Sequence, residues 1–201
     1  MMPDVFWALL LAALLELDTT YAFQLTFSRG IVAGPLLALL TGDLMAGVQI
    51  GAFTELLFAD INPLGGVLPP SAVVCCAVSL ILHVFHVPLY VAFFFGVVCA
   101  ILFSHAERWL RKIRSNWLLS WEECISKKPA MLTRLMILLL LGSFLFSFIL
   151  LSVFTVVCKP LAVWVTEHLS EQALTACKFA YIAVPWIGLS SLIASFRLKT
   201  K

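Results

Sequence analysis

Acidic and amide side chains lie inside an apolar stretch between residues 29 and 70, where they could hydrogen-bond a polar ligand. An ionisable group in hydrocarbon costs about 2.5 kcal/mol or more, so it is rarely found there without a role. Carboxylates and amides are suited to the paired hydroxyl groups of a sugar, and nearby glycines allow close backbone approach. The candidate binding residues are Gln49, Thr54, Glu55, Asp60 and Asn62.

Glu55 is the residue that we expect to anchor such a ligand. Gln49 precedes Glu55 by six positions, and Thr54 points about 100° away from it on a regular helix. A site that uses all of these side chains therefore requires the chain to fold back. The alternative is that Glu55 and Asp43 are structural groups that seal contacts between helices.

Glycine and proline in the same stretch predict broken or re-entrant helices near residues 30–70. Residues 30–58 form two apolar halves joined by Thr41-Gly42-Asp43, and each half is shorter than the roughly 20 residues that cross a bilayer. A broken helix pair and one long tilted helix both remain open at this point. The candidate structural or hinge residues are Gly42, Asp43, Gly51, Gly65, Gly66, Pro69 and Pro70.

Residues 59–70 have the composition of a turn-rich loop,. A solvated loop is accordingly the alternative interpretation of Asp60 and Asn62.

The composition predicts an all-α, polytopic integral membrane protein with one membrane domain over residues 1–201. Hydrophobic residues make up 62% of the chain and charged residues 12%, about half the charged share of a soluble domain. The net charge of +2 and the lack of a basic face with interleaved aromatic residues argue against nucleic-acid binding,. The six cysteines are interpreted as small buried apolar residues,.

The apolar segments cover residues 5–27, 30–58, 71–104, 132–158 and 172–196. In the first segment, we expect the helix to continue to Phe27 with Glu16 and Asp18 facing protein; the alternative is that it ends near these acids. The third segment is either two helices or one helix kinked at Pro88.

Residues 105–131 predict an amphipathic helix at the membrane surface. Trp109, Ile113, Trp117 and Trp121 recur every fourth position beside basic residues,. The excess of Lys and Arg places this loop in the cytoplasm by the positive-inside rule. A plain connector helix is the alternative.

The residues needed for covalent chemistry are missing from the sequence. There is no phosphate-binding glycine loop, no H-E-x-x-H and no G-x-S-x-G,. His83 and His86 have no third ligand nearby, so neither a metal nor a cofactor is predicted. We expect a transport protein that is not itself an enzyme.

The stretch from Phe27 to Pro70 resembles the membrane subunit IIC of the mannose/fructose/sorbose family of bacterial sugar phosphotransferase systems. The resemblance covers about residues 5–100 and fades to hydropathy after that. The matching residues, in order, are Phe27-Ser28-Arg29, Leu40-Thr41-Gly42-Asp43 with Gly47, Gly51-Ala-Phe-Thr-Glu55-Leu and Pro63-Leu-Gly65-Gly66-Val-Leu-Pro69-Pro70.

The resemblance implies a sugar translocator in the bacterial inner membrane that moves a hexose-type sugar inward. Its partners would be a IID membrane subunit and cytoplasmic IIA and IIB phosphocarriers in an oligomeric complex, with IIB phosphorylating the sugar. It also implies that Glu55 lies in the sugar-facing core, and that the Pro63–Pro70 loop belongs to a hairpin tip.

Family members usually continue beyond the stretch that resembles residues 180–197, so the resemblance implies a short or truncated member. A membrane scaffold or regulator that kept the fold and lost transport is the alternative function. An unrelated channel or exporter, which would need no partner subunit, is a third.

Overall fold

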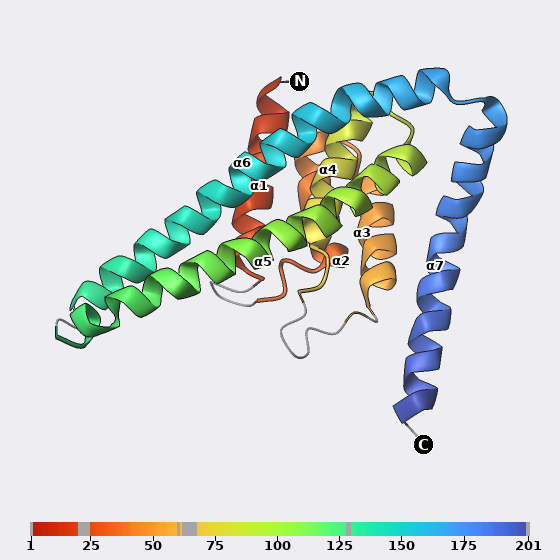
Figure 1. The fold of residues 1–201 in the computed structure, drawn as a ribbon. Coiled ribbons are helices and arrows are strands. Elements are labelled where there is room, and N and C mark those ends of the chain that lie inside the picture. Colours follow the sequence, from red (N-terminus) through yellow and green to blue (C-terminus); the bar gives the residue numbers. More distant parts are fainter. Residues whose placement is uncertain (1, 20–24, 60, 62–67, 128–129, 200–201) are drawn as a thin grey trace.

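A computed structural model describes residues 2–19, 25–59, 61, 68–127 and 130–199. These residues form helices and no strands, which confirms the all-α prediction (Figure 1). The helices are α1 (Met2–Leu17), α2 (Gly30–Thr41), α3 (Leu44–Phe58), α4 (Ala72–Val84), α5 (Leu89–Lys127), α6 (Ala130–His168) and α7 (Glu171–Lys199).

The four short helices α1 to α4 pack together into a core, which we call the short-helix core. Its central helix is α4, which contacts α1, α2, α3, α5 and α6. Every residue of α4 from Val73 to Leu82 is buried. Helix α4 ends before Pro88, and α5 begins at Leu89, so the third apolar segment is two helices.

Helices α2 and α3 form a hairpin, so the apolar stretch 30–58 is broken as one of the two interpretations predicted. The break falls at Gly42, whose φ of +88° is in the left-handed region that glycine adopts without strain,. The next residue, Asp43, caps α3 by accepting a hydrogen bond from the amide of Ala46 at 3.0 Å,. The tip of this hairpin is therefore Gly42-Asp43, at the opposite end of α3 from Pro69 and Pro70.

Four glycines let the two helices of the hairpin touch backbone to backbone. Gly30 and Gly34 on α2 meet Gly51 and Gly47 on α3, and a Cβ atom added to Gly34 would overlap the carbonyl oxygen of Gly47. Small residues at four-residue spacing are the usual means by which helices approach closely in a membrane. The role of Gly51 is thus close packing within the hairpin.

Helix α1 ends at Leu17, ten residues before the end that we expected at Phe27. The side chain of Asp18 accepts hydrogen bonds from the amides of Leu25 at 2.8 Å and Ser28 at 3.3 Å. Aspartate competes with the helix for backbone amides, which explains the early end. Glu16 and Asp18 are nevertheless buried, so both acids do face protein.

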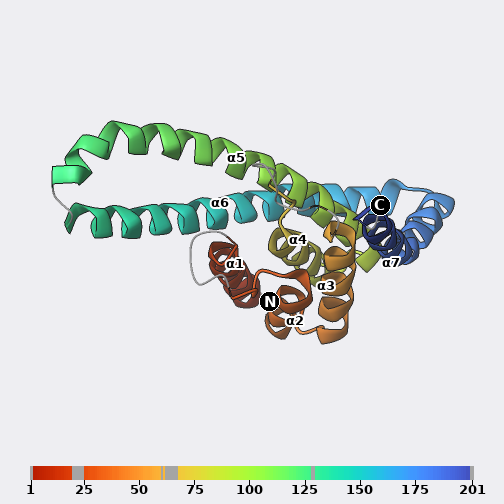
Figure 2. The same cartoon turned by 90° about the horizontal axis from the view of Figure 1, so that it is seen from below.

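Helices α5 and α6 are a long antiparallel pair that extends beyond the short-helix core (Figures 1 and 2). The expected separate loop helix over 105–131 does not occur, because α5 continues without a break to Lys127. Likewise, α6 extends past residue 158 to His168. Residues 105–127 contain neither glycine nor proline, so neither residue type interrupts the helix there,.

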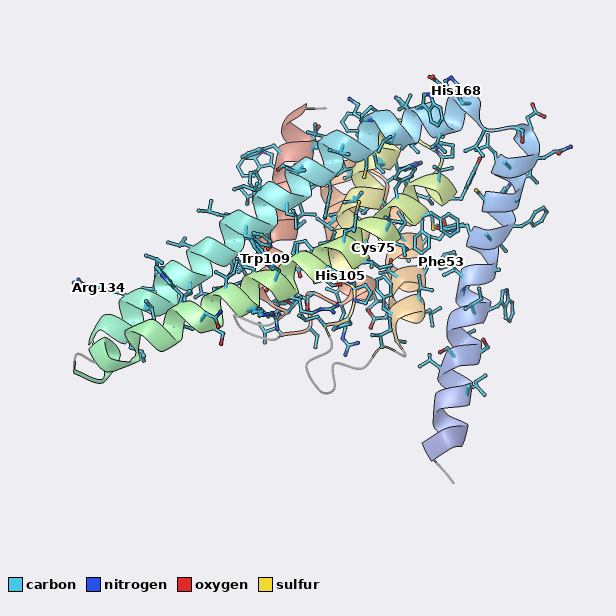
Figure 3. The ribbon with its side chains drawn as sticks, in the orientation of Figure 1. Phe53, Cys75, His105, Trp109, Arg134 and His168 are labelled. Carbon is cyan, nitrogen blue, oxygen red and sulfur yellow. The ribbon has the colours of Figure 1, made fainter. Side chains whose placement is uncertain are left out.

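Much of the long pair exposes apolar side chains. Leu138, Leu141 and Leu145 on α6 are each more than half exposed, and so is Trp109 on α5. Among the described residues, the helices long and apolar enough to cross a membrane are Leu89–Leu118, Leu132–His168 and Glu171–Ala194. Figure 3 shows Arg134 near the distal end of the pair, far from Phe53 and Cys75 in the short-helix core.

Helix α7 turns back and lies beside α3. Gly188 permits this approach, since a Cβ atom there would lie 2.6 Å from the carbonyl oxygen of Leu56. Nearer the N-terminus of α7, Tyr181 packs against the rings of Phe53 and Phe93. Helix α3 is therefore held between α2, α4 and α7.

Candidate functional site

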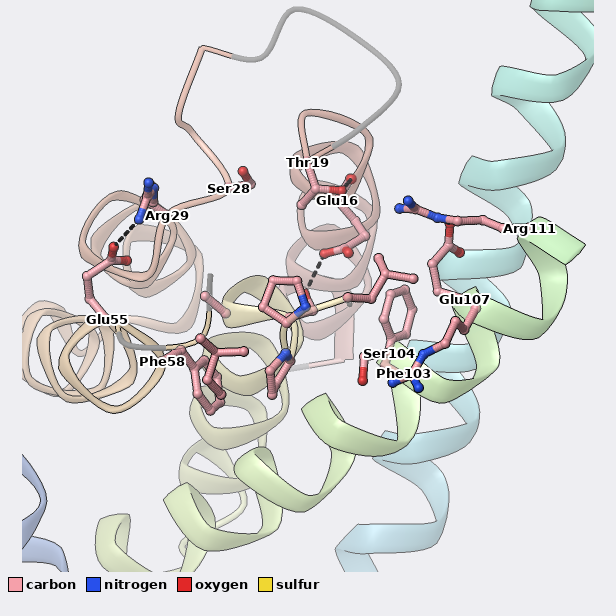
Figure 4. Close-up of a pocket in the computed structure, with 17 residues that line it drawn as sticks. Glu16, Thr19, Ser28, Arg29, Glu55, Phe58, Phe103, Ser104, Glu107 and Arg111 are labelled. Carbon is pink, nitrogen blue, oxygen red and sulfur yellow. Dashed lines mark hydrogen bonds and ion pairs between the residues drawn. The ribbon is translucent and has the colours of Figure 1, made fainter. Parts of the chain in front are cut away.

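A cavity of about 590 Å³ opens where the short-helix core meets α5 (Figure 4). Its volume falls within the range of about 300–1,000 Å³ that is typical of small-molecule sites. The polar residues that line it are Glu16, Thr19, Ser28, Arg29, Glu55, Ser71, Ser104, Glu107, Arg108 and Arg111. Apolar surface comes from Phe58, Ile61, Leu68, Pro69, Pro70, Ala72 and Phe103.

Glu55 stands on one wall of the cavity, in the last turns of α3. One carboxylate oxygen accepts a hydrogen bond from Nη1 of Arg29 at 2.8 Å, and the other accepts from the backbone amide of Gly30 at 2.9 Å. Gly30 is the first residue of α2, where backbone amides lack partners within the helix. Glu55 thereby ties the end of α3 to the start of α2.

Glu16 stands on another wall, at the end of α1. The hydroxyl of Ser71 donates a hydrogen bond to its Oε2 at 2.7 Å and accepts one from the amide of Val74 at 3.3 Å. Ser71 is the N-cap of α4, so this carboxylate also lies at the start of a short helix. The partial positive charge of a helix N-terminus favours an anion there.

The wall from α5 carries a group of opposite charges. Glu107 is buried and lies 3.1 Å from Nε of Arg111 and 3.4 Å from Nη2 of Arg114. Arg114 also donates a hydrogen bond to Ser143 of α6 at 2.6 Å. These contacts fix the part of α5 that faces the cavity against α6.

The structure separates two of the other predicted binding residues, Thr54 and Gln49, from this cavity. Thr54 is fully buried and faces α4, with its hydroxyl 3.5 Å from the sulfur of Cys75. Gln49 is exposed on α3 and does not line the cavity. Asp60 and Asn62 lie outside the described residues. The structure thus places Glu55 in the cavity without Thr54 or Gln49.

The predicted hinge residues fall into separate places. Asp43 lies at the hairpin tip, where its Oδ2 is 3.3 Å from Nε2 of His83. Pro69 and Pro70 form part of the cavity wall just before α4. Gly65 and Gly66 lie outside the described residues.

Several cavity residues were not among the sequence-based candidates. Ser71 precedes an apolar helix directly after Pro69-Pro70, which is a recognisable N-cap signal. Glu16 was noted as an acid facing protein, but nothing in its neighbourhood links it to residue 71. Glu107 and Arg111 looked like members of a surface helix, because their position at the cavity is visible only in three dimensions.

The chain matches the family described as "PTS system sorbose-specific iic component" over residues 4–200. This match reaches well beyond residues 5–100, to which the sequence motifs had limited the resemblance. In Escherichia coli (strain K12), the "Putative N-acetylgalactosamine permease IIC component 2" is 39% identical over 46 residues, which is 23% of this chain and 35% of that protein. The aligned part is therefore about a third of the length of that relative.

The fold also resembles that of a solved structure named "Structure of membrane protein". The TM-score is 0.64 with 18% sequence identity, over 96% of this chain and 77% of the other. This likeness concerns the arrangement of the helices alone. Since the family match covers nearly the whole sequence, the chain belongs to the sorbose-type IIC family of the sugar phosphotransferase system, a family of membrane components of sugar transport.

Proposed function

We propose that this chain is the sugar-translocating IIC component of a phosphotransferase system. It moves a hexose-type sugar inward, with phosphorylation by a IIB partner, and it binds the sugar in the cavity between the short-helix core and α5. Discontinuous helices that meet near a ligand are the usual way in which membrane transporters build such sites.

The carboxylate of Glu55 is the observation that carries the proposal. It is held in place by Arg29 and by the Gly30 amide, and it lines a cavity that has both polar and apolar walls. A fixed carboxylate can accept hydrogen bonds from sugar hydroxyls, and the apolar wall that includes Phe58 and Phe103 can face the less polar side of the ring. Glu55 is at the same time a structural link between α3 and α2.

Replacement of Glu55 by glutamine tests this role. Glu55→Gln keeps an oxygen that can accept from the Gly30 amide and loses the charge that pairs with Arg29 and binds the sugar. We expect uptake of radiolabelled sugar by cells that hold the partner subunits to fall at least about tenfold, because a hydrogen bond to a charged group contributes about 1.5–3 kcal/mol. Membrane insertion should be unchanged.

Glu167→Gln provides the matched control, since Glu167 is exposed on α6 and does not line the cavity. It should transport at the wild-type rate. Equal uptake by Glu55→Gln and Glu167→Gln would show that Glu55 does not bind the sugar. Candidate sugars for the assay are D-mannose, D-fructose, L-sorbose and N-acetyl-D-galactosamine.

The cavity is proposed to open toward the cytoplasm of the bacterial inner membrane. Arg108 and Arg111 lie at the cavity and belong to the basic run over 105–131, which the positive-inside rule assigns to the cytoplasm. Ser115 is exposed on the same helix. In Ser115→Cys, the new thiol should react with an impermeant maleimide only in inverted vesicles, and labelling of intact cells would reverse this orientation.

The proposed assembly contains a IID membrane subunit and cytoplasmic IIA and IIB phosphocarriers, with the phosphoryl transfer carried by these partners. A scaffold or regulator that does not transport is the second candidate function. Co-purification with a IID subunit but no uptake of any sugar would support this second function.

A further inference from the structure

Two carboxylates face the same cavity, and each lies at the start of a different short helix. Glu55 lies at the start of α2, and Glu16 lies at the start of α4. Glu55 is paired with a guanidinium group, whereas the only side chain that hydrogen-bonds the carboxylate of Glu16 within the described residues is Ser71. Their surroundings therefore leave them with different capacities to accept further hydrogen bonds.

Glu16 has one occupied and one open carboxylate oxygen. Its residue is only 8% exposed, yet it lines the cavity (Figure 4). Oε2 accepts a hydrogen bond from Ser71, while Oε1 has no hydrogen-bond partner among the described residues. The described side-chain atoms that are both fully buried and without a partner are Nε of Arg114 and the hydroxyl oxygen of Tyr181, so Oε1 of Glu16 is not fully buried. Oε1 is thus accessible from the cavity and free to accept a hydrogen bond.

A buried carboxylate without a full set of partners is costly, so the position needs an explanation. Helix α4 supplies part of it, because the positive end of its dipole and the Ser71 hydroxyl both favour the charged form. On α5, the negative charge of Glu107 disfavours the charged form of Glu16, whereas the positive charge of Arg111 favours it. What these groups leave unsatisfied is the single oxygen that points into the cavity.

We propose that Glu16 is a second sugar-binding carboxylate, which accepts a hydrogen bond from a sugar hydroxyl other than the one that Glu55 binds, and that Ser71 positions it. The inference rests on the proposed sugar-transport function. With Glu55 and Glu16 on different walls, the cavity recognises the sugar from two sides, and Glu16 contributes to the choice between sugars that differ at one hydroxyl.

The test combines Glu16→Gln with monodeoxy analogues of whichever of the four sugars above is taken up fastest. Uptake is measured as KM and maximal rate in cells that hold the full set of partner subunits. For the wild type, we expect one deoxy position to raise KM about tenfold or more through loss of the bond to Glu16. In Glu16→Gln, the parent sugar should show that higher KM, and removal of the same hydroxyl should then have little further effect.

Glu55→Gln is measured in parallel. This variant should lose the ability to distinguish the parent sugar from a deoxy analogue that lacks a different hydroxyl. Ser71→Ala should weaken discrimination at the Glu16 position without changing the other, and Ser71→Thr should restore it. A purely structural role for Ser71 would lower the amount of protein and leave discrimination unchanged.

The proposal is overturned if Glu16→Gln changes uptake of the parent sugar and of every deoxy analogue by the same factor. It is also overturned if KM for the parent sugar does not change. In either case, the proposed function still stands if removal of one sugar hydroxyl raises KM for the wild type but not for Glu55→Gln. Lack of uptake of all four sugars by the wild type would instead reject the proposed function, and this inference with it.

Discussion

The short-helix core and the long α5–α6 pair are both built from apolar residues but bury them differently. In the core, α4 is buried along almost its whole length, whereas α6 exposes most of the large apolar side chains between Leu132 and Val157. A long helix satisfies its own backbone hydrogen bonds, so it can face lipid or a partner directly. The long pair therefore needs few specific contacts to be stable in a membrane.

The core, by contrast, is made of interrupted helices whose ends must be satisfied by side chains. Each interruption leaves backbone amides without partners at a helix N-terminus. Glu55, Ser71 and Asp43 accept hydrogen bonds from these amides in α2, α4 and α3. The breaks in the core thus create the polar positions, two of which lie at the cavity, while the long pair has no comparable interruption within its described helices.

The largest predicted difference between the two regions concerns their glycines. Gly34→Val places methyl groups where the backbone of Gly47 and Gly51 now lies, so α2 and α3 must separate. A Cβ atom added at Gly142 on α6, the site of the control variant Gly142→Val, meets nothing within 4 Å. We expect Gly34→Val to lose most of the folded protein in size-exclusion chromatography of detergent extracts, and Gly142→Val to behave as the wild type.

Equal yields of folded protein from the two glycine variants would contradict the close packing of the α2–α3 hairpin. A partial loss for Gly34→Ala would sharpen the comparison, because the smaller side chain still overlaps the Gly47 carbonyl oxygen.

A smaller difference is expected between two helix caps. Asp43→Ala removes the hydrogen bond from Ala46 and the contact with His83, and the cap alone contributes about 1 kcal/mol. Ser170→Ala removes only a longer bond from Ala173 at 3.4 Å, at the start of α7. Thermal unfolding in detergent should therefore show the lower midpoint for Asp43→Ala.

A lower midpoint for Ser170→Ala than for Asp43→Ala would mean that the hairpin tip contributes less to stability than the α6–α7 junction. The core would then not depend on its caps in the way described above.

The sequence predicted the nature of the core better than its geometry. Gly42 and Asp43 interrupt an apolar run that is too short for two spans, so composition and length alone predicted a possible break there. The end of α1 at Leu17 was missed because it depends on Asp18 accepting hydrogen bonds from amides seven and ten residues away. Such a contact competes with helix continuation and leaves no periodic pattern.

Only part of the candidate site could be predicted, because its remaining contacts also join residues that are far apart in the sequence. Glu55 was identifiable as a carboxylate in an apolar segment, and it does line the cavity. Thr54, its neighbour in sequence, faces α4 because adjacent helical residues point in different directions,. Glu16 and Ser71 are separated by 55 residues, and no local pattern relates two positions so far apart.

The central claim is that the sugar occupies the cavity between the short-helix core and α5. Its most direct test is protection of an introduced thiol in Thr19→Cys, whose side chain lines the cavity and is exposed. Gln49→Cys, exposed on α3 outside the cavity, is the control. The account predicts that the transported sugar slows maleimide labelling at residue 19 and leaves labelling at residue 49 unchanged. Labelling at residue 19 that proceeds equally fast with and without saturating sugar would contradict it.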